Sequence, residues 1–145
     1  MTGLNHSLTG SLISVFLPVS VAVPAAFVSH FVLDSLPHFG EIFEKRKRLS
    51  KTVWTIDITL SVVFNLFLLV NNHWLILLCS LVAMSPDYAW VYRFTVQEKF
   101  GKMPPKPENK FNRFHVSIQK FERRWGLIIE VIWSVTAYIL LRKYL

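Results

Sequence analysis

Four long stretches of the chain are apolar and nearly free of charge, with short polar segments between them. They cover residues 8–33, 53–70, 74–90 and 125–141. Each stretch is close to the roughly 20 residues that a helix needs to cross about 30 Å of hydrocarbon. The pattern therefore predicts an all-α membrane protein built as a bundle of four transmembrane helices.

The ends of these stretches carry further signs of a membrane protein. Residues 71–73 read Asn-Asn-His, which is too short for anything but a tight connection between antiparallel neighbours. Tryptophans, whose amphipathic rings favour the membrane interface, occur at the ends of the stretches, namely at Trp54, Trp74, Trp90 and Trp125. We predict that the first stretch is one helix of the mature protein, since it lacks the basic start of a signal peptide and carries Pro18 and Pro24.

A different pattern precedes the last stretch. Phe111–Arg124 has apolar residues at the spacing of one helix face, with Arg, Lys and Gln between them. This spacing predicts an amphipathic interfacial helix that lies along the membrane surface and runs into the fourth span, with a bend at Gly126. The proline-rich segment Lys102–Pro107 before it predicts a loop.

The composition agrees with a single integral membrane domain over residues 1–145. Apolar residues make up 52% of the chain and charged residues only 17%, which argues against an ordinary soluble domain. Of the sixteen Lys and Arg, five lie in Lys45–Lys51 and nine in Arg93–Arg124. The positive-inside rule then makes the loops 39–52 and 93–124 cytoplasmic and places both termini outside.

The net charge of +7 does not indicate nucleic-acid binding. No nucleic-acid recognition motif accompanies the basic residues, and membrane topology accounts for their distribution. We therefore expect membrane lipids, including anionic headgroups, as partners, and we leave oligomerisation open.

Candidate chemistry begins at the end of the first apolar stretch. His30 and Asp34 are four residues apart, so on a helix they present an imidazole nitrogen and a carboxylate oxygen to one point. Pro37 disfavours a helical conformation at Leu36, so we expect His38 where the chain leaves the helix and can turn toward the same point. These residue types at this spacing predict a metal site at the membrane surface.

The predicted topology brings other ionisable side chains to the same cytoplasmic level. We assign the metal ligands to His30, Asp34, His38, Asp87 and His115. Imidazoles with a few carboxylates suit zinc first, with manganese or iron as alternatives. The candidate catalytic residues are Glu122 and Asp57, as general bases toward water, and Arg113, as a clamp for phosphate oxygens. On the same topology His6 lies at the opposite face, far from this group.

Each of these residues also has a simpler interpretation, and the sequence leaves both open. His30 and Asp34 could form a buried structural pair, and His38 could be an exposed residue in a turn. Asp87 could cap a helical turn. Asp57 is close enough to the interface to pair with a loop lysine, which we favour slightly over ligation.

The same residues resemble a known family. The run His30-x-x-x-Asp34-x-x-Pro37-His38, the pair Pro86–Asp87 and the opening His6-Ser7-Leu8-Thr9-Gly10 are similar to motifs of the bacterial inner-membrane metal-dependent hydrolases of the LexA-binding type. The resemblance implies a metal, a hydrolytic reaction, the bacterial inner membrane and a site that includes His6. A more distant likeness is to the zinc-dependent phospholipase C signature, in which the Pro and His come two residues later.

Three functions are compatible with these features. The leading hypothesis is a metal-dependent hydrolase that cleaves a lipid or a lipid-linked phosphate or acyl ester at the cytoplasmic interface. The second is a non-enzymatic membrane protein whose polar cluster is structural and whose basic loops dock a partner or anionic lipid. The third is a metal or proton transporter subunit, which the scarcity of polar residues in the outer half of the bundle disfavours.

Overall fold

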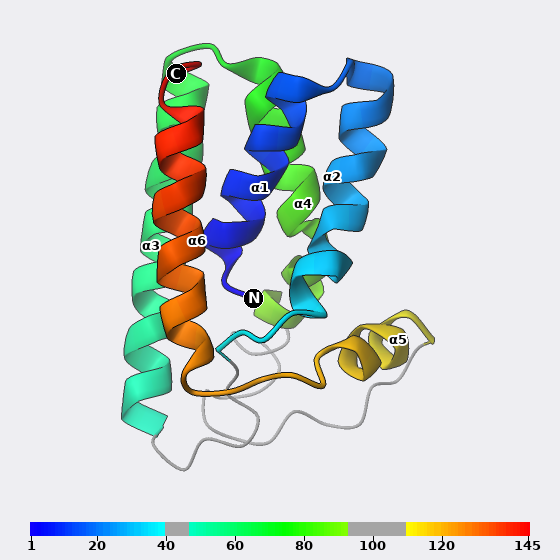
Figure 1. Ribbon diagram of the computed structural model, residues 1–145, viewed down its shortest axis with the longest axis vertical. Coiled ribbons are helices and arrows are strands. Elements are labelled where there is room, and N and C mark those ends of the chain that lie inside the picture. The colour runs from blue at the N-terminus through cyan, green and yellow to red at the C-terminus, as the bar shows by residue number, and fades with distance from the viewer. Residues whose placement is uncertain (40–46, 93–109) are drawn as a thin grey trace.

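The computed structural model describes residues 1–39, 47–92 and 110–145. These residues form six helices and no strand, which confirms the all-α prediction. The helices are α1 (Gly3–Phe16), α2 (Val19–Asp34), α3 (Lys47–Val70), α4 (Trp74–Tyr92), α5 (Lys110–Ile118) and α6 (Gly126–Leu141). Five of them lie side by side and alternate in direction, while α5 lies across one end of the bundle (Figure 1).

The first apolar stretch is two helices, so the prediction of one helix over residues 8–33 is wrong. The chain is extended at Leu17 and Pro18, and α1 and α2 pack against each other as neighbours. Proline disfavours a helical conformation in the residue before it, which explains why α1 ends at Phe16. The amino end of α1 consequently lies at the same end of the bundle as Asp34 (Figure 1), not at the opposite end as a single helix would require.

The other predicted helices agree more closely with the structure. α3, α4 and α6 cover the predicted stretches, and residues 71–73 form the predicted tight connection, in which Asn72 takes a positive φ of 60°. α5 ends at Ile118, so the amphipathic helix is shorter than Phe111–Arg124 and does not run into α6. The predicted loop Lys102–Pro107 lies outside the described residues.

Among the described residues, one helix is long and apolar enough to cross a membrane. It covers Thr52–Val70 in α3, and only 11% of it is buried inside the protein, whereas the core helix of a soluble protein would be mostly buried. Three further apolar helices are shorter, namely Val19–Asp34, Trp74–Tyr88 and Gly126–Leu141. A helix of 16 residues is about 24 Å long, which is less than the roughly 30 Å of the hydrocarbon core.

The helix α1 contacts α2, α3, α4 and α6, although its buried side chains are mostly polar. Hydrogen bonds between helices compensate for this burial. Ser80 Oγ donates to Asn65 Oδ1 at 2.8 Å, Asn65 Nδ2 donates to Ser7 Oγ at 3.1 Å, and the Ser7 and Ser80 hydroxyls also contact each other. Trp133 Nε1 in α6 donates to Thr9 Oγ1 at 2.9 Å. In an apolar environment such bonds hold helices together.

Small residues let α1 and α4 approach closely. A Cβ added at Gly10 would lie 2.3 Å from the backbone oxygen of Cys79 and 2.7 Å from the Ala83 Cβ. Ala22 and Ala26 of α2 complete this buried cluster. The close packing sets the relative height of the three helices and therefore the level of the polar side chains at their ends.

Candidate metal centre

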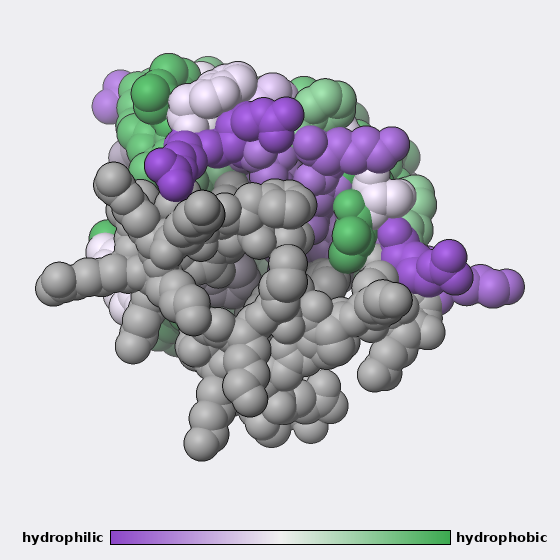
Figure 2. All heavy atoms as spheres, turned by 90° about the horizontal axis from the view of Figure 1, so that it is seen from below, coloured by the Kyte–Doolittle hydropathy of each residue, from purple (hydrophilic) through white to green (hydrophobic). Residues whose placement is uncertain are grey.

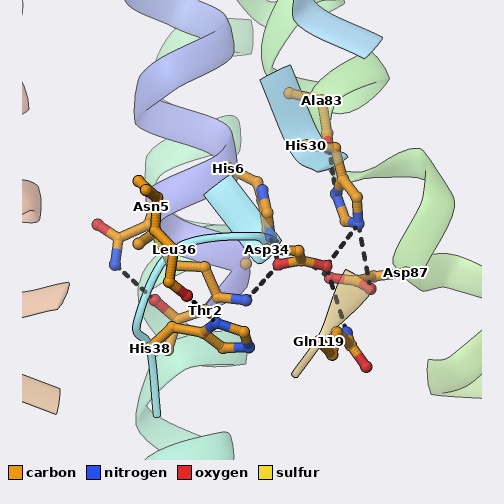
Figure 3. Close-up of polar contacts among 12 residues, drawn as sticks. Thr2, Asn5, His6, His30, Asp34, Leu36, His38, Ala83, Asp87 and Gln119 are labelled. Carbon is orange, nitrogen blue, oxygen red and sulfur yellow. Dashed lines mark hydrogen bonds and ion pairs between the residues drawn. The ribbon is translucent and has the colours of Figure 1, made fainter. Parts of the chain in front are cut away.

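Four ionisable side chains from three helices meet at the end of the bundle near α5. They are His30 and Asp34 of α2, Asp87 of α4 and His115 of α5, and one ligand atom from each lies within 4.8 Å of all the others. The ring of His30 and the carboxylates of Asp34 and Asp87 point toward one another in Figure 3. The structure therefore brings together four of the five predicted metal ligands.

A backbone carbonyl fixes the proton on His30. Its Nδ1 lies 2.9 Å from the Ala83 oxygen, and a carbonyl oxygen can only accept, so Nδ1 carries a hydrogen. In a neutral imidazole the other nitrogen, Nε2, then presents its lone pair to the cluster. Histidines that bind metals usually donate their second ring nitrogen to a carbonyl or carboxylate in this way.

The separations between the ligand atoms fit a small divalent ion. The Nε2 atom of His30 lies 3.2 Å from Asp34 Oδ2 and 3.6 Å from Asp87 Oδ1, and 3.0 Å from His115 Nε2. His115 Nε2 lies 2.8 Å and 3.7 Å from the same two carboxylate oxygens. Ligands about 2.0–2.1 Å from a tetrahedral zinc ion are roughly 3.3 Å apart. Two imidazoles and two carboxylates at these distances could therefore hold a small divalent ion.

His6 belongs to the same cluster, contrary to the predicted topology. Its ring stacks on that of His30, with 4.0 Å between the ring centroids, and its Nε2 lies 3.2 Å from Asp34 Oδ1 and 3.9 Å from Asp87 Oδ2. The break at Pro18 is the cause, because it returns α1 to the end of the bundle where α2 ends. The amino group of Met1 also contacts Asp34.

Aromatic contacts hold α5, and with it His115, against α2. The ring of Phe31 packs edge to face against Phe111 and His115 and in a tilted orientation against Phe114, with centroids 5.5–6.0 Å apart. Just after α5, Gln119 Nε2 donates to Asp34 Oδ2 at 3.2 Å. The predicted amphipathic pattern thus serves to place His115 and a second polar group beside Asp34.

His38 and Glu122 lie beside each other but do not join the four-residue group. His38 Nδ1 donates to the Leu36 oxygen at 2.7 Å, and its Nε2 is 4.0 Å from Glu122 Oε1. The two residues also form an isolated β-bridge, in which the Arg123 amide donates to the His38 oxygen at 2.8 Å. Burial of the ring, followed by the charge of the Met1 amino group, lowers the pKa of His38 from 6.5 to about 4.

The other predicted catalytic residues, Asp57 and Arg113, are not members of the four-residue group. Asp57 accepts hydrogen bonds from the backbone amides of Gly3 and Leu4, both at 2.8 Å, so it binds the first turn of α1. The side chains of the loop lysines with which we expected it to pair lie outside the described part of the chain. Arg113 is exposed on α5. A further carboxylate, that of Glu130 in α6, is buried and accepts a hydrogen bond from the Phe39 amide at 3.0 Å.

The cluster is open to solvent chiefly at Asp87. The side chain of Asp87 is 28% exposed, whereas those of His6, His30, Asp34 and His115 are fully buried. Viewed from this end of the bundle, hydrophilic side chains gather over the described surface, and hydrophobic residues lie toward its rim (Figure 2). The partial exposure of Asp87 therefore gives water access to the centre.

Sequence reasoning missed three groups that the structure adds to the site. The Ala83 carbonyl and Gln119 carry no pattern that marks them as partners of a metal site. His6 had a usable signal, since Pro18 follows it closely enough to turn the chain, and the family resemblance also includes it.

Neither protein-family models nor curated proteins nor solved structures gave a match to this chain.

Proposed function

We propose that the chain is a membrane-bound, metal-dependent hydrolase that cleaves a lipid or lipid-linked ester. The observation that carries the proposal is the convergence of two imidazoles and two carboxylates, with the His30 lone pair directed at the oxygens of Asp34 and Asp87. Lone pairs that converge in a buried place repel each other unless a cation or a proton lies among them. Zinc is the first choice for this donor set, with manganese or iron as alternatives.

The outer surface of the bundle supports a place in the membrane. Large apolar side chains are exposed on two of its outer helices, including Ile56, Leu60, Val63, Phe67 and Val70 of α3 and Ile128, Val131, Ile132, Val135 and Ile139 of α6. Contiguous apolar surfaces of this kind are rare on soluble monomers. In our proposal the five long helices form a multi-pass bundle in the inner membrane, and the basic segments 39–52 and 93–124 face the cytoplasm.

The position of the cluster suggests its substrate class. The centre lies at the end of the bundle that α5 crosses (Figure 1), and in our proposal this end lies at the depth of lipid ester and phosphate groups. A substrate with an apolar tail could lie against the bundle while its ester reaches Asp87, the partly exposed member of the cluster.

The residues divide the chemical work between them. When bound, a divalent ion supplies Lewis acidity and lowers the pKa of water toward about 7. The Ala83 carbonyl orients His30, Gln119 orients Asp34, and both therefore hold the ligand atoms ready for an ion. Asp87, the partly exposed ligand, lies where water can enter the centre. In hydrolysis the ester bond to the alcohol oxygen breaks, the hydroxyl of the water bonds to the acyl or phosphoryl group, and the released alcohol takes the other proton of the water.

The first experiment is to purify the full chain in mild detergent and measure bound metals by elemental mass spectrometry. A His30→Ala, Asp34→Ala double variant is compared with wild type, and His73→Ala serves as a matched control, since His73 lies at the other end of the bundle beside Leu145. We expect metal in wild type and in the control and none in the folded double variant. Phospholipid and polyprenyl phosphate esters are then screened for metal-dependent release of the alcohol.

The competing function is a non-enzymatic membrane protein whose cluster is structural. The 2.8 Å contact between His115 and Asp34 favours it, because a protonated imidazole would satisfy that carboxylate without a metal. Absence of metal in wild type, even after incubation with zinc, manganese and iron salts, would decide for this structural function and against the hydrolase.

A further inference from the structure

The carboxylates of Asp34 and Asp87 each divide their two oxygens between different histidines. Asp34 Oδ2 and Asp87 Oδ1 face His30 and His115 at 2.8–3.7 Å. The other oxygens, Asp34 Oδ1 and Asp87 Oδ2, face His6 at 3.2 Å and 3.9 Å. A single ion would use one oxygen of each carboxylate. The second pair of oxygens, together with His6, makes a further set of ligand atoms.

We propose that the centre binds two metal ions, the second held by His6 and bridged to the first by Asp34 and Asp87. This inference rests on the metal centre of the proposed function and adds a position to it. The first ion would have four protein ligands and the second would have three. A site with three protein ligands keeps a coordination position open for water or substrate.

The stacking of the His6 and His30 rings supports two metal positions rather than one. The rings of His6 and His30 are 4.0 Å apart and inclined by only 21°, and both present Nε2 to the carboxylates. Ions on two such parallel nitrogens would be separated by about the distance between the rings. Paired metal sites that hydrolyse esters have ions roughly 3.5–4 Å apart.

The burial of His6 supplies an independent reason to place a second ion on its ring. The ring is fully buried, and within the described residues neither of its nitrogens makes a hydrogen bond. A buried polar nitrogen without a hydrogen bond is unfavourable, and an ion between Nε2 and the Asp34 and Asp87 oxygens, 3.2 Å and 3.9 Å away, would remove this cost. The amino group of Met1 contacts the same Asp34 oxygen, and the second ion would take its place.

Two ions change which substrate is favoured. Paired ions stabilise both the entering and the leaving oxygen in a displacement at phosphorus. Among the esters of the proposed function, a lipid phosphate ester is therefore favoured over an acyl ester.

The test is the metal content of the full chain in detergent, depleted of metal and reloaded with zinc. His6→Phe removes the ligand nitrogen and keeps an aromatic ring against His30, and His73→Phe is the matched control. We expect two ions per chain in wild type and in the control and one in His6→Phe. Circular dichroism and gel filtration establish that the variant is folded.

A second measurement does not depend on any variant. X-ray absorption spectroscopy of zinc-loaded wild type should show a zinc–zinc distance of about 3.5–4 Å. A single ion in wild type, with no such distance, would overturn the second position and leave the proposed function intact. No ion at all would overturn both, and two ions retained in folded His6→Phe would exclude His6 as the ligand.

Discussion

The Nδ1 nitrogen of His30 donates to the backbone oxygen of Ala83 at 2.9 Å, and this bond joins the end of α2 to the middle of α4. It fixes both the tautomer and the direction of the ring. Because Ala83 also lies in the small-residue cluster where α1, α2 and α4 meet, the helix packing itself aims the His30 lone pair at the carboxylates. The site is therefore preorganised by the fold.

The first prediction distinguishes the hydrogen bond between His30 and the Ala83 oxygen from metal ligation by His30 Nε2. In His30→Asn the shorter amide can still donate to the Ala83 oxygen but cannot reach the cluster as Nε2 does. We expect the variant to fold and to bind zinc at least about 100-fold more weakly, since loss of an outer partner alone costs roughly 10- to 100-fold. Competition with a zinc chelator measures the affinity, and His73→Asn is the control. Wild-type affinity in folded His30→Asn would contradict the assignment.

The second prediction concerns the close approach of α6 to the segment after α2. A Cβ added at Gly126 would lie 2.2–2.6 Å from backbone atoms of His38, which cannot move away cheaply. We expect Gly126→Ala to destabilise the protein by about 1–3 kcal/mol, seen as a lower thermal midpoint in detergent. Gly3→Ala is the comparison, since the neighbours of its Cβ would be side-chain atoms at 3.2–3.4 Å, and its effect should be smaller. Equal effects would argue against a steric cause.

Local spacing predicted most of the cluster. The interval of four residues between His30 and Asp34 requires only a helix, and the apolar face of α5 marks the side on which His115 packs. Asp87 followed from the alternating direction of the helices. These inferences use periodicity and topology, both of which can be inferred directly from the sequence.

The position of His6 depended on which proline breaks a helix. Pro18 ends α1, whereas Pro24 lies inside α2 and Pro86 inside α4. All three disfavour a helix in the same local way, and tertiary packing decides which of them the chain accommodates. That difference moved His6 into the cluster: Pro18 signalled a possible break, but its local effect alone does not distinguish it from Pro24 or Pro86. His38 stayed outside because its ring is held by Leu36.

The third prediction tests Asp57 as a structural residue, against its assignment as a catalytic base. Asp57 accepts from the first two amides of α1, which have no partner within their own helix. We expect Asp57→Ala to lower stability by about 1–2 kcal/mol while metal content stays at the wild-type value. Thr59→Ala, an exposed change on the same helix, should alter stability by less than about 0.5 kcal/mol. Loss of metal in folded Asp57→Ala would restore Asp57 to the site.

The fourth prediction is a pH dependence of stability that arises from His38. Its pKa is about 4 in the folded protein and 6.5 in an unfolded chain, so between these values the unfolded state binds more protons. Stability should therefore be full above about pH 6.5 and should fall as the pH is lowered toward 4, by up to about 3 kcal/mol. His38→Asn can keep the bond to the Leu36 oxygen but does not titrate in this range, so its thermal midpoint should fall less between pH 7 and pH 4. If the variant loses as much stability on acidification as wild type, another group is responsible, and burial of His38 does not set the acid sensitivity of the fold.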